Sequence, residues 1–157
     1  PKKGWNYSVQ DTREAFTTAE LYPEAIERHP STVASFFENE TAELLTRFSD
    51  ILLLGHDYAE DLDRLKRLLQ LAETANVSLD GKAFPRIGAI GSRSKWKSFT
   101  ASCIDVGIQS TTLDQVRCPI GLNIGAESPE EIAIAVIAEI LSMHKDADVH
   151  APNWRDQ

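Results

Sequence analysis

Five consecutive residues, Gly91-Ser92-Arg93-Ser94-Lys95, combine side chains and backbone freedom suited to binding anions. They follow an apolar stretch and precede a helical pattern, so we expect them to lie between a strand and a helix. Backbone N–H groups at the start of a helix attract negative charge, and glycine lets a ligand approach closely. Gly91, Ser92, Arg93 and Lys95 are therefore candidates for binding a phosphate or another anion.

The basic residues around this segment favour the same interpretation. Residues 82–97 include five basic side chains and no acidic one, although the whole chain has a net charge of −8. The five are Lys82, Arg86, Arg93, Lys95 and Lys97. The alternative is a basic face that contacts only solvent.

A second candidate segment, Gly55-His56-Asp57, ends the apolar run Asp50–Leu54. A histidine at the end of a strand can contact a ligand or carry a proton. The alternative is a turn in which Asp57 caps the next helix, with Glu60 in the capping-box position. No second histidine, cysteine or carboxylate stands at a typical metal-ligand spacing from His56, so we expect no metal site.

Asp11 ends an expected strand, Tyr7–Asp11. In a dinucleotide-binding fold, an acidic residue at the end of the second strand accepts hydrogen bonds from ribose hydroxyls. The glycine-rich phosphate fingerprint stands roughly 20 residues upstream of it, but only ten residues precede Asp11. The sequence therefore predicts a fold that lacks its first strand and helix, and a turn-capping aspartate is the alternative role for Asp11.

The last candidate segment is the loop CPIGLNIG, residues 118–125. Gly121 and Gly125 permit backbone conformations that other residues avoid. A loop that combines glycines with large apolar residues is typical of a binding surface. Cys118, followed by Pro119, is a candidate to ligate a soft metal centre or to join sulfur transfer, and a buried structural cysteine is the alternative.

The composition limits the classes of function. An acidic chain is not attracted in bulk to nucleic acids or anionic membranes, and no apolar run approaches the ~18 residues that cross a bilayer. Two cysteines without a CxxC pair favour a reducing cytoplasm over a disulfide framework. The chain has no GxSxG or GKS/GKT motif and no supported Ser/His/Asp arrangement, so nothing marks a hydrolase or an NTPase.

The elements that would position these segments alternate between strands and helices. We expect strands at 7–11, 50–54 and 86–90, an apolar run at 32–37, a loop at 74–85 and a helical turn at 111–116. We expect helices at 18–28, 40–48, 57–73, 94–105 and 128–143, of which the first is either interrupted by Pro23 or begins there. This pattern predicts a three-layer α/β domain with a parallel, Rossmann-like sheet over residues 1–145, followed by a tail over 146–157. Ligands of such sheets bind at the carboxyl ends of the strands.

The helix that begins at Ser128 is the clearest of these elements. Ser128-Pro129-Glu130-Glu131 supplies an N-cap, a proline at the first helical position and a capping-box glutamate. Residues 132–143 are apolar nearly all round, so we expect this helix to be largely buried.

The run from Cys118 to Leu141, CPIGLNIGAESPEEIAIAVIAEIL, resembles the C-terminal signature of the XdhC/CoxI family of xanthine dehydrogenase accessory proteins. Three further segments follow the order of that family. Asp11 to Phe16 resembles its D-x-R-x-x-F stretch, which adds Arg13 to the candidates, and 55–57 and 91–95 resemble its T/G-H-D and G-S-R-x-K segments.

The resemblance implies a maturation factor that binds the molybdenum cofactor, protects it during sulfuration by a cysteine desulfurase, and delivers it to a molybdenum hydroxylase apoenzyme. By position it implies a ligand site lined by Asp11, His56, Ser92, Arg93, Lys95 and Gly121. We also expect a homodimer and a cofactor-binding protein in preference to an enzyme. An NAD(P)-dependent oxidoreductase and a purely structural scaffold are the alternatives.

Overall fold

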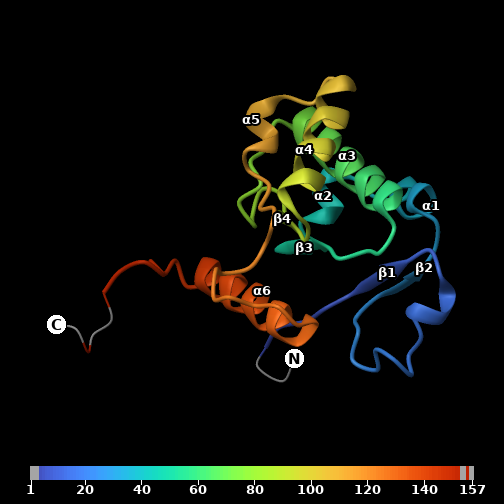
Figure 1. Ribbon diagram of the computed structural model, residues 1–157. Coiled ribbons are helices and arrows are strands. Elements are labelled where there is room, and N and C mark those ends of the chain that lie inside the picture. The colour runs from blue at the N-terminus through green and yellow to red at the C-terminus, as the bar shows by residue number, and fades with distance from the viewer. Residues whose placement is uncertain (1–3, 153–154, 156–157) are drawn as a thin grey trace.

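The structure is a computed structural model that describes residues 4–152 and 155, and its strands and helices alternate along the chain (Figure 1). The strands are β1 (Val9–Asp11), β2 (Arg28–Pro30), β3 (Asp50–Leu53) and β4 (Arg86–Ala89). The helices are the short 3-10 helix η1 (Glu14–Phe16), α1 (Val33–Glu38), α2 (Ala42–Leu45), α3 (Tyr58–Ala75), α4 (Arg93–Asp105), α5 (Ser110–Leu113) and α6 (Pro129–His144).

All of these strands pair in parallel, but they form two separate sheets. β1 pairs with β2, with Val9 opposite Arg28. β3 pairs with β4, with Asp50 opposite Arg86. A single bridge from Gly88 to residue 117 extends the second pair beyond β4. The parallel α/β architecture is confirmed, and the expected sheet is present as two halves.

Side chains of the β3–β4 sheet point alternately to two helical layers. Leu53, Ile87 and Ala89 enter a core that also contains residues of α3 and α4. Leu52 and Ile90 point the other way and pack with residues of α6. In Figure 1, α3 and α4 accordingly lie on one side of β3 and β4, and α6 lies on the other. The pair is therefore the middle of three layers, as expected for a sheet whose two faces are both covered.

Local capping defines where the long helices begin. The Asp57 carboxylate accepts a hydrogen bond from the Glu60 amide at 3.0 Å, and the Ser92 hydroxyl accepts one from the Lys95 amide at 3.2 Å. Ser128 takes part in the full capping box that its sequence predicts. These contacts join residues three positions apart, which is why the sequence predicts the starts of α3 and α6 correctly.

One prediction for the first third of the chain is wrong. Residues 18–27 form turns and bends instead of a helix, because Pro23 has no N–H to donate and disfavours a helical conformation in the residue before it. The strand β2 begins where that helix was expected to end. The apolar run that follows is helix α1, capped by the Thr32 hydroxyl.

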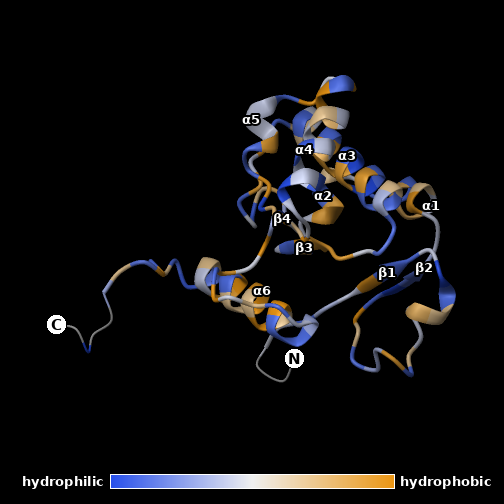
Figure 2. Ribbon diagram, viewed as in Figure 1, coloured by the Kyte–Doolittle hydropathy of each residue, from blue (hydrophilic) through white to orange (hydrophobic). Residues whose placement is uncertain are grey.

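The expected burial of α6 is also wrong. Ala135, Val136 and Ile140 are buried against the sheet, but the opposite face of the helix is open (Figure 2). Ile134 is 61% exposed and Ile137 is 50% exposed. A helix that is apolar all round is expected to be buried on every side. Among the described residues, other segments cover only one side of α6.

Candidate functional site at the carboxyl ends of the strands

Asp11, at the carboxyl end of β1, is held by Arg13. One oxygen of Asp11 accepts hydrogen bonds from the Arg13 amide at 2.8 Å and from its Nε at 3.1 Å, and the other accepts from Nη2 at 3.0 Å. The side-chain hydrogen bond from Arg13 lowers the pKa of Asp11 below its ordinary value. The carboxylate is thus ionised and already paired, and a ribose hydroxyl would have to share it with a guanidinium.

Gly55 follows β3 and packs on a buried carboxylate. A Cβ atom at this position would lie 2.7 Å from Oδ1 of Asp61, so only glycine fits without displacement. The same oxygen accepts a hydrogen bond from Nη1 of Arg64 at 2.7 Å. Arg64 also donates from Nε to the Gln10 side chain at 2.9 Å, which links the end of β3 to β1.

His56 and Asp57 lie between β3 and α3. The His56 side chain is exposed, and Asp57 caps α3. The two interpretations of this segment are compatible, since capping by Asp57 leaves His56 open to solvent. The structure adds Tyr58, whose hydroxyl is hydrogen-bonded to Ser98 of α4 and whose ring meets Phe99 edge-on at 4.9 Å. A contact between residues 40 positions apart has no signal in a single sequence.

The segment after β4 has the geometry expected of an anion-binding helix start. Ser92 caps α4, and Arg93, the first helical residue, is exposed. Lys95 turns back instead of outward, because its ammonium group donates to the Ile90 carbonyl at 3.0 Å and lies 5.2 Å from the centre of the Phe99 ring. Arg93 is therefore the more available cation of the two.

The five basic residues between 82 and 97 do not form one face. Arg86 begins β4 and donates from Nε to Asp50 at 2.8 Å, so its charge is paired at the amino end of the sheet. Lys82 precedes β4, whereas Arg93 and Lys95 follow it. The alternative of one solvent-facing basic surface is therefore not what the structure has, because a strand that spans about 3.3 Å per residue carries its two ends to opposite edges of the sheet.

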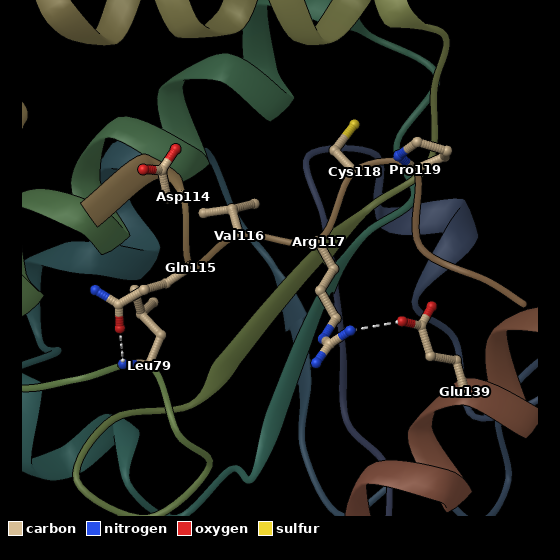
Figure 3. A pocket seen from close by; sticks show the side chains of 8 residues that line it. All are labelled: Leu79, Asp114, Gln115, Val116, Arg117, Cys118, Pro119 and Glu139. Atoms are coloured by element: carbon tan, nitrogen blue, oxygen red, sulfur yellow. Dashed lines mark hydrogen bonds and ion pairs between the residues drawn. The ribbon is translucent and has the colours of Figure 1, made fainter. Parts of the chain in front are cut away.

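Cys118 is half-buried close to Lys95. Burial raises the pKa of the Cys118 thiol, and the positive charge of Lys95 partly opposes this shift. The cis peptide bond to Pro119 follows directly. Both residues border a hollow of about 560 Å³, in which the Cys118 sulfur points away from the Arg117–Glu139 ion pair (Figure 3).

Gly121 and Gly125 have different surroundings. The Gly121 amide donates to Oε1 of Glu139 at 2.6 Å, and a Cβ atom there would lie 3.4 Å from the Ala135 methyl group. Gly121 therefore packs on α6. Gly125 has a φ of 77° and nothing within 4 Å of an added Cβ atom. Its requirement for glycine comes from backbone conformation alone.

Most of the predicted residues thus lie in two groups, and Gly121 and Gly125 belong to neither. Arg64 connects Asp11 and its neighbours to Gly55, while the charge of Lys95, in the segment after β4, acts on the Cys118 thiol. Among the described residues, no three His, Cys, Asp or Glu side chains are placed to hold a metal ion together. Within the same residues, no helix is both long and apolar enough to cross a membrane.

Parallel strands covered on both faces, with loops and capped helix starts at their carboxyl ends, define an α/β domain of the Rossmann type. The model of the XdhC Rossmann domain family matches residues 2–140 of the chain. The chain belongs to this family.

Two curated proteins are similar to the chain over most of its length. The uncharacterized protein YqeB of Escherichia coli (strain K12) is 29% identical over 146 residues, which are 92% of this chain and 24% of that protein. A probable xanthine dehydrogenase subunit of Bacillus subtilis (strain 168) is 28% identical over 148 residues, which are 90% of this chain and 37% of that protein. The chain therefore spans well under half the length of either relative.

A solved structure shares the fold. The crystal structure of a xanthine dehydrogenase from Bacillus halodurans matches with a TM-score of 0.69 at 22% identity. The match covers 92% of this chain and 38% of that one.

Proposed function

We propose that this domain belongs to an accessory protein that binds the molybdenum cofactor, or a nucleotide, and assists its sulfuration and its insertion into a xanthine dehydrogenase-type hydroxylase. Membership of the XdhC family supports this role. The name of the Bacillus subtilis relative, which describes part of a probable xanthine dehydrogenase, points to the same class of enzyme. A hydroxylase apoenzyme and a cysteine desulfurase are the partners that this function requires.

The observation that carries the proposal is the start of α4. Its backbone N–H groups, the Ser92 cap and the exposed Arg93 lie together at the carboxyl end of β4. Such an arrangement favours an anion through both the helix dipole and the unpaired N–H groups. Arg93 and the helix start would hold the phosphate of the cofactor, and Lys95 would add to the local positive potential.

Cys118 is less well suited to the sulfur chemistry than the start of α4 is to binding an anion. A ligand to molybdenum or a sulfur carrier must act as a thiolate, whereas burial raises the pKa of Cys118 and so favours its protonated form. The domain is therefore suited to holding and orienting the anionic part of the cofactor. The molybdenum itself, when the cofactor is bound, supplies the chemistry of the hydroxylase.

The NAD(P)-dependent oxidoreductase stays an alternative prediction based on Asp11. The Arg13 ion pair occupies both oxygens of Asp11, which weakens the argument for a ribose contact. The α/β architecture, which is the other basis of that alternative, is compatible with both functions.

Binding measurements on the natural protein test the proposal. Molybdenum cofactor released from a molybdoenzyme should bind, and Arg93→Gln should weaken binding about tenfold, as expected for one charge-assisted contact. The control is Lys82→Gln, which makes the same change of charge at the opposite end of β4 and should leave binding within about twofold, since no charge-assisted contact is removed. Equal effects of the two substitutions, or failure of the protein to bind either the cofactor or a nucleotide, would contradict the proposal.

A further inference from the structure

The Lys95 side chain lies back across the turn between β4 and α4. A side chain in the first turn of a helix leans toward the helix N-terminus, and Lys95 is in the first turn of α4. Its aliphatic chain passes over Gly91, where a Cβ atom would lie 2.6 Å from Cδ of Lys95 and 3.4 Å from its Cγ. Any larger residue at position 91 would therefore displace the lysine side chain from this path.

The ammonium group at the end of this path is held by two neighbours. Nζ donates a hydrogen bond to the Ile90 carbonyl at 3.0 Å and lies 5.2 Å from the centre of the Phe99 ring. Phe99 is 0% exposed, so the ammonium group is anchored on the core. Lys95 is accordingly half-buried, whereas Arg93 and Lys97 of the same helix are exposed. Of these three basic residues, Lys95 is the one committed to contacts within the protein.

Lys95 bonds to both neighbours of Gly91. Its side chain donates to the Ile90 carbonyl, and its backbone N–H donates to the Ser92 hydroxyl at 3.2 Å. Gly91 itself has a φ of 151°, a conformation that other residues rarely adopt, and glycine has more conformational freedom to lose than any other residue. Two hydrogen bonds from one residue therefore restrain the chain on either side of this glycine.

The Ile90 carbonyl lies at the same edge of the sheet as the start of α4. Ile90 directly follows β4 and is half-buried. A half-buried carbonyl without a donor costs stability, and its partial negative charge would oppose an anion bound at the start of α4. The Lys95 ammonium group satisfies this carbonyl and offsets its charge, and it does both without reaching a ligand.

We infer that Lys95 is a positioning residue of the anion site: its side chain holds the turn at residues 90–92, from which Arg93 and the backbone N–H groups of α4 extend, and it does not contact the anion itself. The inference rests on the proposed function, because it concerns the same site. By resemblance to the XdhC family, Arg93 and Lys95 both line the ligand site. The contacts of Lys95 separate the two roles, because they leave only Arg93 free to meet the anion.

Amide hydrogen exchange of the natural protein, without ligand, tests whether Lys95 holds the turn. The Trp96 amide donates to the Ser92 carbonyl at 3.0 Å and so reports on the start of α4. Lys95→Met keeps the aliphatic chain but removes the donor, and it should lower the protection of the Trp96 amide about tenfold, as expected when a hydrogen bond to a charged group is lost. The control, Lys97→Met, makes the same change of charge at an exposed position of the same helix and should change this protection less than about twofold. Unchanged protection in Lys95→Met, or equal losses in both variants, would overturn the inference.

A titration with inorganic phosphate, followed through the amide signals of Arg93 and Ser94, tests whether Lys95 contacts the anion. Lys95→Met should weaken phosphate binding about fivefold, because the turn is loosened. Gly91→Ala places a methyl group against Cδ of Lys95 and so already displaces the side chain. In the Gly91→Ala background, Lys95→Met should therefore weaken binding less than about twofold.

The outcomes of this cycle of substitutions separate the two roles of Lys95. An equal weakening in both backgrounds would mean that Lys95 acts on the anion directly, and it would overturn the inference. An unchanged phosphate affinity of the Lys95→Met single variant would overturn it as well. If phosphate shifts neither amide signal of the unmodified protein, the proposed function fails, while the exchange experiment still decides whether Lys95 holds the turn.

Discussion

Arg64 Nε lies 2.9 Å from Oε1 of Gln10, and this hydrogen bond joins residues 54 positions apart in the sequence. The same guanidinium holds the buried Asp61 carboxylate at 2.7 Å. Arg64 is therefore the cation around which the end of β3, the start of α3 and the strand β1 are assembled.

Replacing Arg64 should destabilise the protein strongly. Arg64→Leu leaves the Asp61 carboxylate buried without a cation, which costs about 3 kcal/mol of unfolding free energy in comparable buried pairs. Arg67→Leu on the same helix removes an exposed pair with Asp63 and should cost less than about 1 kcal/mol. Urea unfolding of both variants measures the difference, and equal losses would argue against a central role for Arg64.

Acid should weaken the ion pair between Asp50 and Arg86 at the amino ends of β3 and β4. Burial alone would raise the pKa of Asp50, but hydrogen bonds from Arg86 and Ser49 outweigh it, and the net pKa is lowered. A lowered folded-state pKa gives stability that is full above the unfolded value of about 3.9 and is lost as the pH falls through the folded-state value. As the pH falls below about 5, the Asp50→Asn variant should therefore lose less unfolding free energy than the unmodified protein. The urea midpoint of both proteins is measured against pH. If the two curves run parallel, Asp50 contributes nothing to the acid sensitivity of the fold.

The Cys118 thiol should react slowly. Because burial raises its pKa, the thiolate fraction near pH ~7.5 is small, and alkylation by iodoacetamide should be at least about tenfold slower than that of glutathione. Lys95→Met should slow the reaction further by removing the opposing charge, while Lys97→Met, on the exposed side of α4, should not. Peptide mapping by mass spectrometry separates Cys118 from the fully buried Cys103. A Cys118 that outpaces glutathione would reopen its role in sulfur transfer.

Gly88 should tolerate no larger residue. A Cβ atom there would overlap Cδ1 of Ile120 and lie 3.1 Å from its Cβ. Gly88→Ala should cost about 1–3 kcal/mol, as expected for overpacking a filled site. Ile120→Val removes the overlapping methyl group, so the double variant should be more stable than the sum of the single effects predicts. Strict additivity in a thermal or urea unfolding cycle would mean that Gly88 is needed for another reason.

Local patterns account for much of what the sequence predicts correctly. The starts of α3 and α6 depend on caps three residues apart, and the apolar runs of β3 and β4 predict buried strands without any knowledge of their partners. The interruption of the expected helix at Pro23 is a local signal as well, and in the structure it outweighs the helical pattern around it. The candidate loops follow from the same local information, because the ends of strands identify them.

The sequence by itself determined the alternation of strands and helices, the capped helix starts and the resemblance to the XdhC family. Only the tertiary structure decided that Arg86 pairs with Asp50, that Lys95 folds back onto Ile90, and that α6 is covered on one face. The physical reason is the distance along the chain over which each interaction acts. Caps and periodicity act over three or four residues, whereas charge pairing and burial depend on segments that meet only after the chain has folded.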